Sequence, residues 1–145
     1  RASMEAIATL IALVKREERD RFSNKLYLRL NKEKDARTRI LAAQALAHIP
    51  SEESRDALST QLQDKDVSVV KALVDALIVH ELPASVNLLE GAMDHSNSEV
   101  RSYAYDVTSQ LKPDGLRQVV KKLFQRRLKL ESDAQLKSKL QSYLK

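Results

Sequence analysis

Residues 67–82, with the sequence VSVVKALVDALIVHEL, constrain the fold more than any other stretch of the chain. On a helical period their apolar side chains cover most of the circumference, and only Ser68, Lys71 and Asp75 form a narrow polar strip. A helix that is apolar nearly all round, and too short to span a membrane, must be covered on several sides by other elements. The stretch therefore predicts the central helix of an all-helical stack.

The composition also favours an all-α fold. The 145 residues include only two glycines and three prolines, and the plentiful Ala, Leu, Lys, Arg and Glu are good helix formers. This length suits one domain with a real core, so we expect residues 1–145 to form a single domain. The chain has no cysteine, which excludes disulfides and thiolate metal sites. No apolar run is long enough to cross a membrane, and we expect a cytoplasmic location.

Hydrophobic periodicity predicts nine helices joined by short connections. Asp35 is a good N-cap, Ser96 and Glu99 have the spacing of a capping box, and so do Ser132 and Gln135. A charged corner at residues 16–20 should separate the first two helices. The predicted helices cover residues 4–15, 36–49, 51–63, 67–82 and 84–93, with one ending near Lys32 and three more marked by Val100–Leu111, Leu116–Phe124 and Leu136–Leu144.

The helices form a repeat. A shift of 31 residues aligns Asp35 with Asp66 and Asn97, and Arg39 with Val70 and Arg101. A fixed period near thirty residues, with two helices in each period, is typical of an α-solenoid. One helix pair cannot bury its apolar face alone, so the pairs stack. The predicted fold is a right-handed α-α superhelix of about four stacked helix pairs.

At these positions the chain resembles the HEAT-repeat family, and most closely the short bacterial type also seen in phycobilin-lyase-like proteins. The resemblance rests on Asp35 or Asp66, on Arg39 or Arg101, and on the Ala-Leu pairs 45–46 and 76–77. It covers nearly the whole chain, with the clearest copies at residues 19–111. In the family the turn Asp and the Arg form a ladder between neighbouring repeats, which implies that role for these residues. Val70 replaces the Arg and Asn97 replaces the Asp, so we expect no regular ladder through the central repeat.

The predicted first helix, residues 4–15, matches the second helix of a repeat whose first helix is missing. Terminal repeats need polar faces. Either this helix is itself the cap, or the natural protein continues upstream of Arg1. We favour the second interpretation, because Arg1 is not a natural start.

Residues that could support catalysis do not gather in the sequence. There is no Gly-rich phosphate loop, and no two histidines are spaced to bind a metal on one helical turn. His80 lies on the buried stripe, where we expect a hydrogen-bonded structural role; His48 should lie on an outer strip and His95 in a turn. We therefore expect a noncatalytic protein without a metal or cofactor.

The better functional candidate is the concave face, which one helix of each pair lines in a solenoid. In the repeat register its outward strip mixes both charge signs with polar and apolar groups, which favours a protein or peptide partner over a phosphate backbone. A plain solvated face is the alternative interpretation. The main candidates for partner binding are Arg37, Gln44, Ser68, Lys71, Asp75, Glu99, Ser102 and Asp106, and Ile40, His48, Val79 and Gln110 complete the strip.

Nucleic-acid binding is the second hypothesis, because charge is unevenly distributed. Residues 1–50 and 114–145 are basic, whereas residues 51–113 carry 5 Lys/Arg against 11 Asp/Glu. The candidate contacts are Arg21, Lys25 and Arg29 near one end and Lys121, Lys122 and Arg126 near the other. Binding a phosphate backbone requires a continuous basic track, and the acidic middle should separate these two clusters.

Overall fold

The computed structural model describes residues 3–4, 6–7, 16–80, 83–111 and 113–145, and all regular secondary structure in these ranges is helical. The predicted helix over residues 4–15 lies for the most part outside them. The helices are α2 (Arg16–Lys32), α3 (Ala36–Leu46), α4 (Glu52–Thr60), α5 (Val67–Val79), α6 (Pro83–Leu88), α7 (Glu90–Met93), α8 (Ser98–Ser109), α9 (Asp114–Leu130) and α10 (Ala134–Tyr143).

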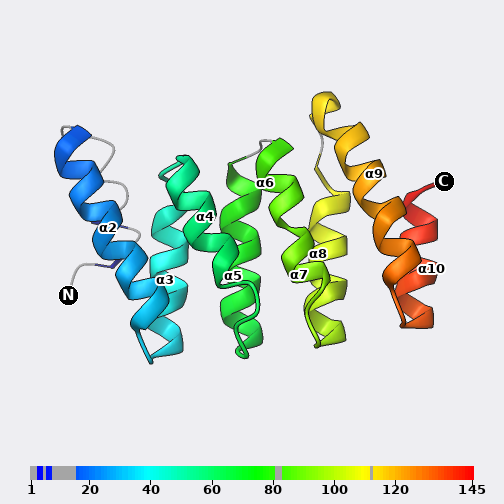
Figure 1. Cartoon of the computed structure of the whole chain (residues 1–145), viewed down its shortest axis with the longest axis horizontal. Coiled ribbons are helices and arrows are strands. Elements are labelled where there is room, and N and C mark those ends of the chain that lie inside the picture. The colour runs from blue at the N-terminus through cyan, green and yellow to red at the C-terminus, as the bar shows by residue number, and fades with distance from the viewer. Residues whose placement is uncertain (1–2, 5, 8–15, 81–82, 112) are drawn as a thin grey trace.

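These helices stack in two rows, as the sequence predicts for a solenoid (Figure 1). A front row contains α2, α4, α6 with α7, and α9, and a back row contains α3, α5, α8 and α10. Within the back row α5 packs against α3 on one side and α8 on the other, and it also contacts α4 and α6 of the front row. The all-α stack of helix pairs is therefore confirmed.

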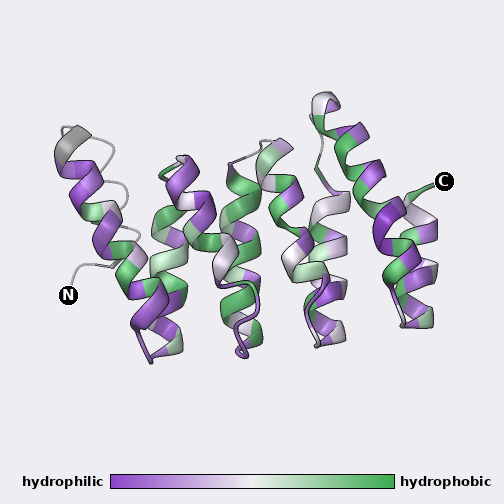
Figure 2. Ribbon diagram, in the orientation of Figure 1, coloured by the Kyte–Doolittle hydropathy of each residue, from purple (hydrophilic) through white to green (hydrophobic). Residues whose placement is uncertain are grey.

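The position of α5 follows from its composition. Hydrophobic residues run along most of this helix (Figure 2). Seven of its side chains are buried, namely those of Val69, Val70, Ala72, Leu73, Val74, Ala76 and Leu77. Burying a Val or Leu side chain stabilises a fold by about 1.5–3 kcal/mol. The prediction of a central helix covered on both flanks is correct.

Short polar side chains cap the N-termini of the back-row helices. Asp35, Asp66 and Asn97, the three residues that the repeat aligns, are the N-caps of α3, α5 and α8, and each accepts a backbone N–H of the first turn. Asp133 caps α10 in the same way. The two predicted capping boxes are thus one residue out of register: Asn97 and Asp133 cap these helices instead of Ser96 and Ser132.

Two predicted boundaries also differ from the structure. Residues 16–20 lie inside α2 and form no corner, because Arg and Glu are good helix formers and no Gly or Pro interrupts them. The predicted helix over residues 84–93 breaks at Leu89 into α6 and α7. Next to this break, a Cβ atom at Gly91 would lie 3.0 Å from Leu62 Cδ1, which is closer than an ordinary van der Waals contact. Because glycine has no Cβ, α7 can pack close to the preceding repeat.

The core lies between the two rows and includes Leu46, Leu58, Leu89, Met93, Tyr105 and Leu123, all fully buried. Within the described ranges, no helix combines the length and apolar character that a membrane crossing requires.

Candidate partner-binding surface

An ion pair crosses the boundary between the α3 and α5 repeats. Arg39, four residues after the α3 N-cap, places Nε 3.0 Å from Asp64 Oδ2, and its Nη1 donates to the carbonyls of Glu33 and Lys34. Both charged side chains are largely buried. Asp64 Oδ1 in turn accepts the backbone N–H of Asp66. The arginine therefore ties the turn before its own helix to the turn before the next one.

The same arrangement joins the α8 and α10 repeats. Arg101 Nε lies 3.0 Å from Glu131 Oε1, and Arg101 Nη1 donates to the carbonyls of His95 and Ser96. Glu131 Oε2 accepts the backbone N–H of Asp133, and its Oε1 accepts a hydrogen bond from the Tyr105 hydroxyl at 2.7 Å. The Glu131 side chain is only 1% exposed.

At the boundary between the α5 and α8 repeats, a histidine takes the place of the ion pair. Val70 occupies the arginine position of α5, and His95 occupies the acid position two residues before the α8 N-cap. His95 is buried; its Nδ1 accepts the Asn97 N–H at 3.0 Å, so its Nε2 donates to the Asp64 carbonyl at 2.9 Å. The His95 ring thus joins the two turns by hydrogen bonds, in the place where the other boundaries have an ion pair.

This geometry corrects one expectation that came from the family resemblance. The arginines do form a ladder, but their partners are Asp64 and Glu131, two residues before the N-caps. Asp35 and Asp66 are N-caps, and a side chain that accepts first-turn N–H groups faces its own helix. The expected irregularity at Val70 is confirmed.

His80 has the structural role expected of it. It is 7% exposed, and its Nε2 lies 3.2 Å from the Leu46 carbonyl, which links the ends of α5 and α3. Burial lowers the pKa of His80 below its ordinary value, which favours the neutral ring. His48 is exposed, as expected for the outer strip.

The predicted contact strip lies on the exposed side of the back row, and its C-terminal part is crosslinked. Tyr103, six residues after the α8 N-cap, donates from its hydroxyl to Asp75 Oδ1 at 2.5 Å. Burial and this hydrogen bond raise the pKa of Tyr103. Lys71 Nζ lies 2.9 Å from Glu99 Oε1 and 5.3 Å from the centre of the Tyr103 ring. These contacts crosslink α5 and α8 on this surface.

An equivalent bridge closes the surface between α8 and α10. Lys139, six residues after the α10 N-cap, lies 2.9 Å from Asp106 Oδ1 and 2.7 Å from Ser102 Oγ. Tyr143 also donates to Asp106 Oδ1. Burial alone would raise the pKa of Asp106, but the hydrogen bonds from Tyr143 and Lys139 lower it. Five of the eight predicted contact residues, Lys71, Asp75, Glu99, Ser102 and Asp106, therefore have partners inside the protein.

The surface between α3 and α5 is open, for a reason that the sequence contains. The residue six positions after the α5 N-cap is Ala72, where α8 has Tyr103 and α10 has Lys139, and Gln44 stands where the bridged Asp75 and Asp106 stand. A methyl group cannot reach across to the neighbouring helix. A groove of about 420 Å³ lies there, lined by Ile40, Gln44, Ala47, His48, Ser68, Lys71, Ala72, Asp75, Ala76 and Val79.

This groove brings together seven residues of the predicted strip, and Arg37, Glu99, Ser102, Asp106 and Gln110 lie outside its lining. Ala47, Ala72 and Ala76, which also line it, were missed, since small apolar residues read as core positions. Val79, at 58% exposed, is its most exposed large apolar side chain. The groove therefore combines an apolar floor with a rim of mixed polarity.

The two basic clusters lie in the front row at opposite ends of the stack, on α2 and α9 (Figure 1). Between them stand α4, α6 and α7, which carry Glu52, Glu53 and Glu90. Arg29 pairs with Glu33 and Arg126 with Glu90. The six predicted nucleic-acid contacts are thus not brought together.

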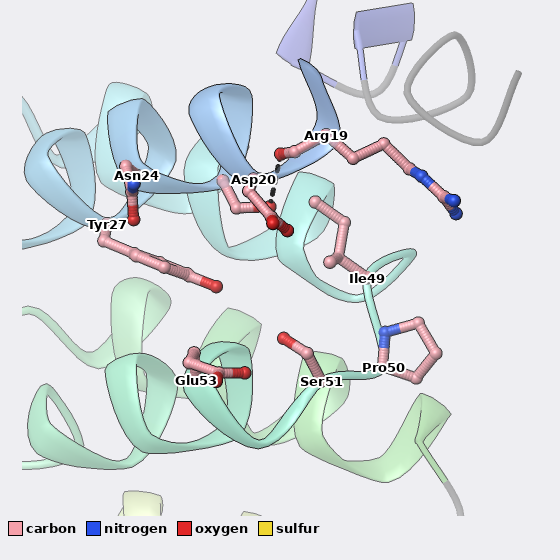
Figure 3. A pocket seen from close by; sticks show the side chains of 9 residues that line it. Arg19, Asp20, Asn24, Tyr27, Ile49, Pro50, Ser51 and Glu53 are labelled. Atoms are coloured by element: carbon pink, nitrogen blue, oxygen red, sulfur yellow. Dashed lines mark hydrogen bonds between the residues drawn. The ribbon is translucent and has the colours of Figure 1, made fainter. Parts of the chain in front are cut away.

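A second groove, of about 430 Å³, lies between α2 and α4, and sequence reasoning did not indicate it (Figure 3). Its hydroxyl groups have structural partners: Ser23 donates to the Arg19 carbonyl, and Ser51 accepts the Ser54 N–H as the α4 N-cap. Asp20 and Glu53 line it, but none of its described lining residues is a histidine that could act as a base. Among the described residues, no three His, Asp or Glu side chains are grouped to hold a metal ion.

A family model of HEAT repeats matches residues 23–109, which is more than half of the chain. The chain belongs to the HEAT-repeat family. HEAT repeats generally mediate protein–protein interaction or scaffolding, and the family is typically noncatalytic. The matched region of this HEAT-repeat chain contains the α3–α5 groove and the Tyr103 bridge. No curated protein and no solved structure matches the chain.

Proposed function

We propose that this HEAT-repeat protein is a noncatalytic scaffold that binds a protein partner in the groove between α3 and α5. The observation that carries the proposal is a missing bridge. Of the three described back-row junctions, two are crossed by a Tyr or Lys side chain, whereas Ala72 leaves the surface between α3 and α5 open. At the other two junctions the polar side chains already satisfy one another. A partner that docked there would first have to break those contacts.

The lining of the groove favours a peptide segment with a single apolar anchor. Ile40, Ala47 and Val79 offer apolar surface, and Gln44 and Ser68 offer hydrogen-bonding groups at the rim. An apolar anchor in a pocket with a polar rim is the usual arrangement of a binding hot spot. Among the described lining residues Lys71 and His48 are the basic ones, and Lys71 pairs with Glu99. This supports a protein partner over a phosphate backbone.

Peptide display on the immobilised protein tests the proposal. An enriched peptide is then measured against the wild type, Ala72→Tyr and a matched control, Ala84→Tyr, which adds the same side chain at an exposed position at the start of α6. Because a Tyr at position 72 fills the groove as Tyr103 fills the next junction, we expect Ala72→Tyr to weaken binding by about tenfold or more, as loss of one anchor does. Ala84→Tyr should bind like the wild type.

A second variant covers the case in which Ala72→Tyr disturbs the fold. Val79→Ser truncates an exposed side chain, so it leaves the core intact while it removes apolar surface from the groove. We expect it to weaken the same peptide. Enriched peptides that bind both variants like the wild type would refute the proposed site.

A further inference from the structure

A third groove, of about 750 Å³, lies between the ends of α8 and α10 and the first half of α9. Two of the helices beside it, α9 and α10, differ in length. With a rise of 1.5 Å per residue, the 17 residues of α9 extend over roughly 26 Å and the 10 residues of α10 over roughly 15 Å. Figure 1 shows α9 projecting beyond α10. The first half of α9 therefore extends past α10 and lines the groove.

The floor of this groove is apolar. Leu111, Val120 and Leu144 are each partly buried, and Phe124 beneath them is 2% exposed. The Phe124 ring stacks on Tyr143, with 5.6 Å between ring centres and an angle of 29° between planes. Since the Tyr143 hydroxyl is held by Asp106, the stacked ring has a fixed position. The surface is thus preformed for an apolar ligand.

The rim of the groove is basic. Arg117, Lys121 and Lys145 line it, and none of the described lining residues is an acid. The Arg117 side chain is 79% exposed, and its 3.6 Å pair with Asp114 is also exposed, so that pair is weak and leaves the guanidinium accessible. Residues 114–145 carry 9 Lys/Arg against 3 Asp/Glu. Three cations around an aliphatic floor complement a ligand with an apolar face and acidic flanks.

We propose that this groove binds an acidic amphipathic helix of a partner protein. Such a helix places apolar side chains at i, i+3, i+4 and i+7 into the floor, which is how amphipathic helices dock in hydrophobic grooves. Its acidic side chains then face Arg117, Lys121 and Lys145. A flat anionic membrane is a poorer fit, because the floor is recessed between α9 and α10. The described linings of this groove and of the one between α3 and α5 have no residue in common, so the two sites can be tested separately.

The test uses a fluorescein-labelled helical peptide with Leu at those four positions and Glu on the opposite face. Two controls replace every Glu with Lys, or every Leu with Ser. Fluorescence anisotropy is measured at about 0.05 M and about 0.5 M NaCl, which separates screened from unscreened charge interactions. We expect the acidic amphipathic peptide alone to bind, and more weakly at the higher salt concentration.

Neighbouring lysines on α9 provide a matched pair of variants. Lys121 lines the groove, whereas Lys122 is exposed and lies outside the lining. Lys121→Glu replaces an attraction with a repulsion and should weaken binding by about fivefold or more, while Lys122→Glu should change it less than about twofold. Val120→Ser should also weaken binding, and Ala72→Tyr should have no effect.

Four results would overturn the proposal. One is the absence of binding by the acidic peptide at low salt. Another is an equal loss with Lys121→Glu and Lys122→Glu, which would show attraction to overall charge only. The third is binding to anionic phosphatidylserine vesicles in place of the peptide, lost with Lys121→Glu, which would assign the groove to a membrane surface. A Lys121-dependent dimer in sedimentation would assign it to a second copy of the chain.

Discussion

Replacing Glu131 with glutamine removes a buried negative charge from the junction between α8 and α10 with little change in shape. The carboxylate accepts two hydrogen bonds from Arg101, one from the Tyr105 hydroxyl and one from the Asp133 N–H. Burial of the phenol and its bond to Glu131 raise the pKa of Tyr105 to about 12, so it stays a donor at neutral pH. Without the carboxylate, the guanidinium of Arg101 loses its ion-pair partner.

The size of the effect follows from the pKa of Glu131. Burial alone would raise it, but the hydrogen bonds from Arg101, Asp133 and Tyr105 lower it from 4.5 to about 2. The gap between these values corresponds to about 3 kcal/mol of folding free energy at pH 7. Because the folded-state pKa is depressed, this stabilisation is complete above pH 4.5 and disappears as the pH falls towards 2.

Urea unfolding of the wild type and Glu131→Gln, followed by circular dichroism across this pH range, measures the effect. We expect Glu131→Gln to be less stable by about 3 kcal/mol at pH 7, and the difference to shrink towards zero near pH 2. Other carboxylates titrate in both proteins, so their contributions cancel in the stability difference. Glu99→Gln, which breaks an exposed pair with Lys71, should cost less than about 1 kcal/mol. A difference between wild type and Glu131→Gln that does not change with pH would refute the reasoning.

The other predictions concern the central repeat. Val70→Arg and His95→Asp should each destabilise the protein by about 3 kcal/mol, because each buries an unpaired charge. The double variant should recover about 1–3 kcal/mol, because the two new side chains can form the ion pair found at the other junctions. Changes in unfolding free energy that simply add in the double variant would contradict this. Ala76 is 2% exposed, so Ala76→Asp should lower the free energy of unfolding by at least about 3 kcal/mol, and an unchanged melting temperature would disprove the burial. Tyr103→Phe removes the bond to Asp75 and should cost about 1 kcal/mol in the same urea assay; no loss would show that the bridge does not stabilise the stack.

The repeat and its central helix could be predicted because they depend on local patterns. The apolar circumference of α5 determined its burial, and Asp35 was correctly predicted as an N-cap. Its repeat equivalents Asp66 and Asn97 are also N-caps, although Ser96 was expected to cap α8. The acid partners of the ladder could not be predicted in the same way. Asp64 and Glu131 occupy equivalent positions, but His95 interrupts the series, and the spacing changes where Asp133 follows Asn97 by 36 residues.

The sequence predicted where the candidate contact residues lie, but not whether their side chains are free to bind a partner. Lys71, Asp75 and Asp106 lie on the expected strip, yet their charges are already paired across helices by Glu99, Tyr103 and Lys139. Periodicity places a side chain on a face, whereas pairing depends on how far the opposite side chain reaches. For that reason Ala72, whose side chain is a single methyl group, determines where the surface stays open.

The partner should dock at the back-row junction that lacks a bridge. Titrating an isotope-labelled sample with a display-selected peptide, and following backbone amide signals by NMR, tests this most directly. We predict that the shifting signals belong to residues 40–48 and 68–79, on the two sides of the α3–α5 groove. Shifts confined to α8 and α10, with those two segments unchanged, would contradict it.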